Sequence, residues 1–164
     1  MEIRPFKAFR FDESVVSNVG DCIAPPYDVI DGQMQDALYQ KSPYNVVRII
    51  KGKDNPGDSE SDNKYTRAGN FANELISSGA LKEDSAECIY AYVQDFEVGG
   101  ESVRRSGLVA LGKLSEFGRG VQPHEKTLEG PKADRLKLMH AKAAQLGQIF
   151  MLYDDMEKLS LIHI

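Results

Sequence analysis

Apolar residues recur at spacings of three and four in three stretches of the chain, and this period predicts helices. The clearest stretch covers 64–78 and is closed by Gly79. A second covers 33–41, behind Asp31 as its cap. The third covers 131–146, with a proline suited to its first turn. The buried seam of this third helix is predicted to consist of Leu136, Met139, Ala143 and Leu146.

Extended segments alternate with these helices. Strands are predicted at 3–11, 45–51, 88–96, 102–114 and 148–153. Gly99-Gly100 stands in the middle of the chain and is a hairpin signal, whereas the proline pair in 24–29 and the polar run 52–63 predict loops. This order of elements predicts an α+β fold, a mixed sheet with a central antiparallel hairpin and three main helices.

Composition excludes several classes of protein. The 164 residues include 41% apolar and 27% charged side chains, with a formal charge of −5, which argues against a disordered, collagen-like or wholly basic nucleic-acid-binding chain. No apolar run approaches the roughly 20 residues of a membrane helix, and residues 1–6 lack the apolar stretch of a signal peptide. We therefore expect a cytoplasmic protein with no membrane partner. Cys22 and Cys88 lack the spacing of a zinc site.

Charge is distributed unevenly along the chain. Residues 119–142 carry a formal charge of +3, whereas the remainder carries −8. Lys132, Asp134 and Arg135 fall in the first turn of the third predicted helix. A helix start offers free N–H groups, so Lys132 and Arg135 are candidates to hold a phosphate or carboxylate there. The alternative is a solvated helix turn whose charges pair locally.

Just before that helix, His124, Glu125 and Thr127 lie in an irregular stretch. His124 and Glu125 are the candidate catalytic acid and base, because histidine titrates near neutrality and a carboxylate orients it or binds a metal. Thr127 offers a hydroxyl to an anion. The alternative is that all three are exposed loop residues without a chemical role. Whether a metal binds stays open at this point.

A second candidate group follows the proline pair near the start of the chain. Tyr27 and Asp28 stand on a stiff loop and offer one donor and one acceptor to a polar ligand. A turn whose tyrosine packs on the core is the alternative. Arg4 is a further candidate anion contact. An enzyme is favoured if Tyr27 and Asp28 approach His124 and Arg135 across a shared pocket.

Several segments taken together carry a family resemblance. They are Ile3-Arg4-Pro5-Phe6 with Ala8 and Arg10, Ala24-Pro25-Pro26-Tyr27-Asp28-Val29, His124-Glu125-x-Thr127, Pro131-Lys132-x-Asp134-Arg135 and Gln148-Ile149-Phe150-Met151-Leu152-Tyr153. In that order they resemble the amino-terminal half of the bacterial and archaeal family DUF 1015. The resemblance covers essentially everything up to Tyr153, and members of the family are considerably longer than this chain.

The resemblance implies a direction for the chemistry. Some genes of the family lie beside serine-biosynthesis genes, and a distant similarity to the ParB/sulfiredoxin fold implies phosphate-ester or nucleotide chemistry. The first hypothesis is therefore an enzyme of kinase or phosphatase type that acts on a phosphorylated small metabolite or nucleotide, related to serine or phosphoserine, with Mg²⁺ and a nucleotide as cofactors. The alternative is a non-catalytic regulator whose segment 119–142 binds nucleic acid or an anionic effector.

The last six residues resemble something other than protein sequence. Residues 159–164 correspond to the translation of a transposase adapter used in preparing sequencing libraries. We therefore expect 1–158 to be the amino-terminal part of a longer protein, whose missing carboxy-terminal half is a partner of this part. The alternative is a short apolar strand. On the first interpretation His163 is not a candidate ligand or base.

Overall fold

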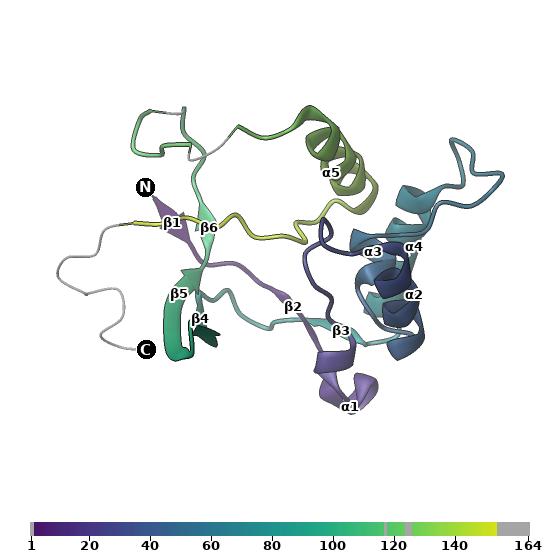
Figure 1. Cartoon of the computed structure of the whole chain (residues 1–164), viewed down its shortest axis with the longest axis horizontal. Helices are drawn as coiled ribbons and strands as arrows, with labels where there is room; N and C mark the ends of the chain where they lie inside the picture. Colours follow the sequence, from purple (N-terminus) through teal and green to yellow (C-terminus); the bar gives the residue numbers. More distant parts are fainter. Residues whose placement is uncertain (1, 117, 124–125, 154–164) are drawn as a thin grey trace. The chain divides into compact units, whose positions relative to one another are not determined.

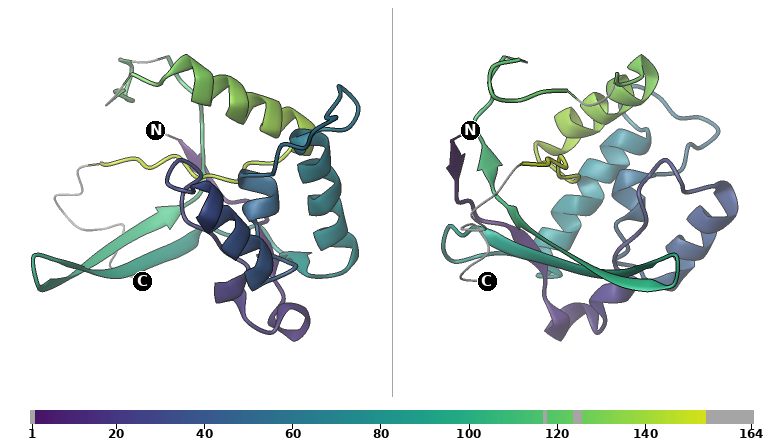
Figure 2. Two further views of the ribbon diagram at one scale, coloured as in Figure 1. Left: turned by 45° about the vertical axis from the view of Figure 1, so that its right-hand side comes forward. Right: turned by 60° about the vertical axis from the view of Figure 1, so that its left-hand side comes forward.

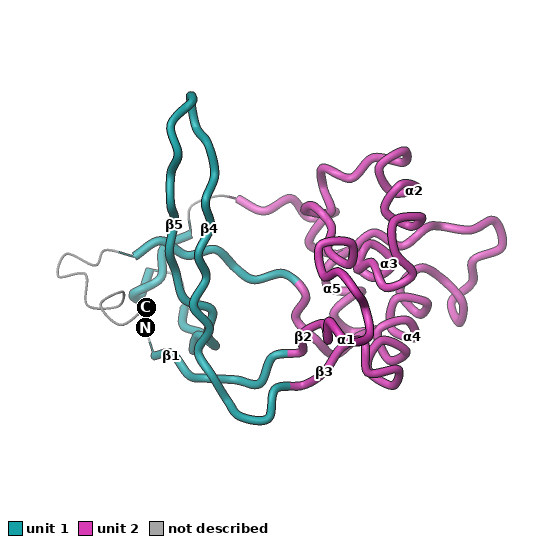
Figure 3. The backbone as a smooth tube through the Cα atoms, turned by 90° about the horizontal axis from the view of Figure 1, so that it is seen from below, with its two compact units in different colours: residues 1–8, 84–124, 147–164 teal, residues 9–83, 125–146 magenta. Residues whose placement is uncertain are grey.

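The structure, a computed structural model, describes residues 2–116, 118–123 and 126–153. The chain divides into two compact units (Figure 3). Unit 1 takes its residues from 1–8, 84–124 and 147–164, and unit 2 takes its residues from 9–83 and 125–146. Each unit therefore combines segments that are far apart in the sequence.

Antiparallel strand pairs make up unit 1. Its main feature is the hairpin of β4, Tyr90–Val98, and β5, Glu101–Val109 (Figures 1 and 2). The two glycines between these strands have φ values of 60° and 86°, a conformation that glycine adopts at little cost. A shorter pair joins β1, Ile3–Arg4, to β6, Leu111–Gly112.

All five α-helices of the described residues belong to unit 2. They are α1, Glu13–Val16, α2, Gly32–Lys41, α3, Val47–Ile50, α4, Lys64–Ser77, and α5, Glu129–Lys142, with a 3-10 turn, η1, at Val19–Asp21 (Figure 1). One strand pair, β2, Phe9–Phe11, with β3, Leu81–Glu83, runs antiparallel in the same unit. Among the described residues, no helix is long and apolar enough to cross a membrane.

Side-chain caps explain where two of the main helices begin. The Asp31 carboxylate accepts a hydrogen bond from the Met34 N–H at 2.7 Å, as the cap predicted for α2 requires. At the start of α4, the Asn63 side chain accepts from the Thr66 N–H at 3.2 Å, and the Thr66 hydroxyl accepts from the Asn63 N–H at 2.9 Å. This reciprocal pair is a capping box, and it satisfies amide groups that have no partner within the helix.

A small apolar core holds unit 2 together. Its buried members are Val16, Cys22, Ile49, Ala68, Ala72, Leu75, Ala80 and Leu138. The helices α4 and α5 are in close contact at Gly69, where a Cβ atom would lie only 2.7 Å from the Ala141 carbonyl oxygen. Gly69 therefore permits a helix contact that any larger residue would disturb.

One fully buried polar side chain links two parts of unit 2. The Asn45 amide donates to the carbonyl oxygens of Asp21 at 2.7 Å and Ile23 at 2.9 Å. Its own oxygen accepts from the Val47 N–H at 2.9 Å, at the start of α3. These three bonds satisfy the buried amide and tie the loop at 21–23 to α3.

The predicted α+β class is confirmed, as are the central hairpin and the three main helices, which are α2, α4 and α5. The loops predicted at 24–29 and 52–63 are also confirmed. All described strands pair antiparallel, in three two-stranded sheets in place of the single mixed sheet that is expected from the order of elements. Two of these pairs belong to unit 1 and one to unit 2, a division that the order of elements alone does not predict.

The strand predicted at 45–51 is wrong, because this segment forms the helical turn α3. Its branched residues favour a strand by propensity. The Asn45 side chain instead accepts from the Val47 N–H, which favours a helical turn locally. Val47 and Ile49 are both buried, and burial of a short apolar run does not distinguish a strand from a helix.

The buried seam predicted for the third helix is also largely wrong. The helix α5 ends at Lys142 and buries Leu138, while Leu136 and Met139 are 53% and 45% exposed. The polar residues Asp134 and Arg135 lie on the packed side and bond to other parts of unit 2. A seam chosen by apolar character alone therefore selects the wrong face.

Residues 148–153 form no strand, although a final strand is predicted there. Their side chains are largely exposed, with Ile149 and Leu152 at 80% and 86%. Without a paired strand their amide and carbonyl groups gain no ladder of hydrogen bonds, so the apolar pattern alone does not produce one. The predicted boundary between 158 and 159 lies outside the described residues.

Candidate functional site

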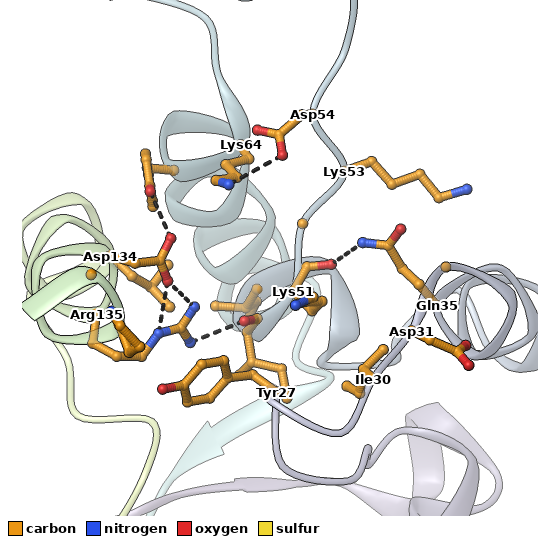
Figure 4. Close-up of a pocket in the computed structure, with 18 of the residues that line it drawn as sticks. Tyr27, Ile30, Asp31, Gln35, Lys51, Lys53, Asp54, Lys64, Asp134 and Arg135 are labelled. Atoms are coloured by element: carbon orange, nitrogen blue, oxygen red, sulfur yellow. Dashed lines mark hydrogen bonds and ion pairs between the residues drawn. The ribbon is translucent and has the colours of Figure 1, made fainter. Parts of the chain in front are cut away.

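An open cavity of about 780 Å³ lies in unit 2 (Figure 4). Five parts of the chain line it. They are the loop with Tyr27, the start of α2, the end of α3 with residues 51–54, the start of α4 and the start of α5. A volume of this size accommodates a small metabolite.

One wall of the pocket is a network around Asp134 and Arg135 (Figure 4). The Arg135 guanidinium lies over the Tyr27 ring, with Cζ 4.0 Å from the ring centroid. It donates to Asp134 through Nε at 3.0 Å and through Nη2, and to the Ile50 carbonyl oxygen through Nη1 at 3.0 Å. The Tyr65 hydroxyl donates to the second oxygen of Asp134 at 2.7 Å. The network therefore joins α5 to the loop at Tyr27, to α3 and to α4.

The network also changes how its members titrate. Burial raises the pKa of Asp134, but hydrogen bonds from Tyr65 and Arg135 outweigh burial, and the pKa of Asp134 is lowered. Burial, followed by the hydrogen bond to Asp134, raises the pKa of Tyr65 to about 12. At neutral pH the pair therefore consists of a carboxylate and a neutral phenol, and neither is suited to exchange a proton with a ligand.

This network predicts a loss of stability in alkaline solution. The pKa of Tyr65 rises from its ordinary value of 10.0 to about 12 in the folded chain. The stability that the neutral phenol contributes to the folded state is therefore complete below pH 10 and is lost as the pH rises towards 12. We expect Tyr65→Phe to be less stable at pH 8 but to lose less stability between pH 10 and 12. Urea unfolding across this range measures both effects, with Tyr92→Phe on the exposed face of β4 as control. An equal alkaline loss in wild type and Tyr65→Phe would contradict the assignment.

Four basic and four acidic side chains line the pocket. They are Lys51, Lys53, Lys64 and Arg135 with Asp31, Asp36, Asp54 and Asp134. Lys53 pairs with Asp36, and the Lys64 ammonium lies 3.1 Å from Asp54. Lys51 differs from these, because no hydrogen bond or ion pair to its ammonium is formed by the residues that the structure describes.

Hydrogen bonds hold the backbone at Lys51. The Lys51 carbonyl oxygen accepts from the Gln35 side chain at 2.7 Å, and the Lys51 N–H donates to the Val47 carbonyl oxygen at 2.9 Å. Figure 4 shows Lys51 between Arg135 on one side of the pocket and Gln35 on the other. The fold therefore positions an ammonium group with unused hydrogen-bonding capacity at the pocket.

Three of the residues predicted as site members do line the pocket. Tyr27 comes together there with Asp134 and Arg135, although more than 100 positions separate it from them in the sequence. The guanidinium of Arg135 uses three of its N–H groups within the protein and retains two, so it both supports the wall and can still contact a ligand.

Other predicted residues do not line it. Asp28, Thr127 and Lys132 are exposed and are not among the lining residues. The Lys132 ammonium lies 3.6 Å from Glu129, one turn earlier on α5. Lys132 thus forms a local pair of the kind given as the alternative for this helix turn.

The remaining predicted residues lie in unit 1 or outside the described residues. Arg4 belongs to β1 of unit 1, where its guanidinium is exposed and pairs with Glu2 at 2.7 Å. His124 and Glu125, the candidate acid and base, lie outside the described residues. Within the described ranges, no three histidine, cysteine or carboxylate side chains gather in a way that could hold a metal ion.

Comparison with known protein families extends these observations. The model of a family described as a protein of unknown function, DUF1015, matches residues 3–163. The chain belongs to the DUF1015 family. No curated protein and no solved structure matches it. Family membership therefore brings no activity or ligand to the DUF1015 chain, and the chemistry of its pocket has to be argued from the lining residues themselves.

Sequence reasoning missed the residue that distinguishes this DUF1015 pocket. Lys51 is the last residue of the segment 45–51 that reads as a strand, so nothing in the sequence marks it as more than a lysine at a strand end. The one available signal is its place between the branched run and the glycine that opens the loop 52–63. Residues at such junctions frequently carry function, because a rigid element positions them.

Proposed function

We propose that this chain binds a small phosphorylated metabolite in the pocket and acts on its phosphate. The single observation that carries the proposal is Lys51, a lining lysine whose ammonium has no partner among the described residues. A phosphate offers the negative charge and the acceptor oxygens that such an ammonium lacks. Lys51 thus takes the phosphate-binding role that the sequence suggests for Lys132.

Arg135 is the second phosphate contact in this proposal. It donates to the carbonyl of Ile50, the residue before Lys51, so the guanidinium is anchored beside the backbone that carries the ammonium. Its two unused N–H groups remain available to an anion. The stacking on Tyr27 fixes the plane of the guanidinium, and a fixed donor loses less conformational entropy when it binds.

A chemical step on the phosphate would need a proton acceptor, and Asp31 is the candidate within the pocket. Asp36, Asp54 and Asp134 each pair with a basic side chain. One oxygen of Asp31 accepts from the Met34 N–H, and the described residues place no basic side chain against it. In a reaction of kinase type, the carboxylate would take the proton of a substrate hydroxyl such as that of serine.

Binding of phosphoserine tests the proposal. We expect wild-type protein to bind it and Lys51→Ala to bind at least about 10-fold more weakly, the effect of losing one charged hydrogen bond to a phosphate. Calorimetric titration measures the affinities, and turnover of serine with ATP or ADP, with and without Mg²⁺, measures the reaction. The matched control is Lys132→Ala on the exposed face of α5, which should bind as wild type does. Equal affinities for wild type and Lys51→Ala would contradict the proposal.

The regulator alternative rests on the basic segment 119–142, and the structure favours it less. Within this segment, Arg119 pairs with Glu116, Lys132 with Glu129 and Arg135 with Asp134. Nucleic-acid binding draws its free energy from unpaired basic residues along one face. Three of the six basic side chains of this segment therefore already have acidic neighbours, which interrupts the basic face that a phosphate backbone would need.

A further inference from the structure

A second, smaller pocket of about 270 Å³ lies in unit 2, and we propose that it binds a second anionic group of the same ligand. The inference rests on the proposed function, which places the first anionic group of the ligand at Lys51. It adds the class of ligand, which is a metabolite with two anionic groups. The volume lies below the range of ordinary small-molecule sites, so it suits a phosphate or carboxylate group rather than a whole metabolite.

Basic side chains dominate this second pocket. Its lining residues are Tyr39, Arg48, Gly52, Lys53, Asn55, Lys64, Arg67 and Phe71. The lining includes four basic residues and no carboxylate. Three of the four pair with carboxylates that do not line the pocket. The surface of the pocket therefore presents donors to a ligand and no group that would repel an anion.

Arg48 is the basic residue without an acidic partner among the described residues. Its guanidinium donates to the carbonyl oxygens of Ser42 at 2.8 Å and Tyr39 at 2.7 Å. Its Cζ lies 4.5 Å from the ring centroid of Tyr39 and 5.7 Å from that of Phe71. The two rings and two carbonyls fix the guanidinium but do not neutralise its charge, so Arg48 is a preorganised anion donor.

The two pockets are adjacent, because three residues line both. These residues are Gly52, Lys53 and Lys64. Gly52 carries no side chain that would separate the pockets. Lys53 and Lys64 are held by exposed pairs with Asp36 and Asp54, and such pairs contribute at most about 1 kcal/mol. An anion of the ligand can therefore attract either ammonium away from its carboxylate, and one ligand can extend from Lys51 into the second pocket.

Calorimetric titration of inorganic phosphate and of tripolyphosphate tests the two-anion ligand. We expect wild type to bind tripolyphosphate at least about 10-fold more tightly than phosphate. Because Lys53 lines both pockets, Lys53→Met should lower the affinity for tripolyphosphate much more than the affinity for phosphate and so remove most of this advantage, whereas Lys51→Met should weaken both. Lys132→Met is the matched control, an exposed lysine of unit 2 outside both pockets. Phosphoserine, titrated in the same series, distinguishes a phosphate from a carboxylate as the second anionic group. If Lys53→Met binds phosphoserine more weakly than wild type does, the second pocket is assigned to the carboxylate.

The results separate the two proposals. Equal affinity for phosphate and tripolyphosphate, or an advantage that survives in Lys53→Met, overturns the two-anion ligand and leaves the Lys51 site in place. If wild type binds none of the three ligands, phosphate, tripolyphosphate and phosphoserine, the proposed function is overturned together with this inference. A loss in Lys132→Met equal to that in Lys53→Met overturns the second pocket, because the effect would then reflect general charge.

Discussion

Replacing Asn45 with alanine is expected to lower the free energy of unfolding by about 3 kcal/mol. The side chain is fully buried and its amide makes three hydrogen bonds to the backbone, two donated to Asp21 and Ile23 and one accepted from Val47. Alanine would leave one buried and two part-buried backbone groups without that partner, and an unsatisfied buried group costs about 1–3 kcal/mol. Urea unfolding followed by circular dichroism measures the change.

The matched control is Asn70→Ala on α4, where the asparagine is exposed. This variant should be as stable as wild type or slightly more stable, because alanine has the higher helix propensity. Asn45→Ala should also bind phosphoserine more weakly, since Asn45 ties the loop that leads to Tyr27 to the helix that leads to Lys51. A loss of stability below about 1 kcal/mol in Asn45→Ala would show that water replaces the three bonds.

Gly69→Ala is expected to destabilise the chain by about 2 kcal/mol, the second large effect. The added Cβ would lie 2.7 Å from the Ala141 carbonyl oxygen, and this neighbour is backbone rather than a flexible side chain. Relief therefore requires α5 to move away from α4. The gain in helix propensity, about 1 kcal/mol, offsets only part of the cost. Thermal and urea unfolding measure the net change.

Gly130→Ala on α5 is the control for this variant, because nothing lies within 4 Å of its added Cβ. It should be neutral or stabilising. Movement of α5 in Gly69→Ala would also displace Asp134 and Arg135, so the fluorescence of Tyr65 and the affinity for phosphate should change together. If Gly69→Ala proves as stable as Gly130→Ala, the two helices are not held at the distance described.

The parts of the fold that depend on local chemistry follow from the sequence. Asp31 before 33–41 and the period of 64–78 place α2 and α4 within a residue of their observed bounds. The glycine pair places the hairpin for the same reason, because only glycine readily adopts both of its φ values. Such features depend on neighbours within a few positions, which a sequence displays directly.

The pocket depends on contacts that a sequence does not display. The sequence identifies Tyr27 and Arg135 as candidates. Whether they contact a ligand or support the wall depends on hydrogen bonds made by Tyr65 and by the Ile50 carbonyl, which belong to other elements. The packed face of α5 is not predictable for the same reason. The sequence leaves Asp134 open between a ligand contact and a solvated helix turn, whereas the structure places it on a packed face with a hydrogen bond from Tyr65.

The separation of unit 2 into 9–83 and 125–146 has a consequence for the order of events during synthesis. The loop at Tyr27, the turn at Lys51 and the start of α4 leave the ribosome well before α5, because the segment 84–124 is made between them. Closing such a long connection costs chain entropy that local contacts do not have to overcome. The cavity therefore lacks one of its five lining parts until α5 is made, and the Arg135 wall is the last part of the site to assemble.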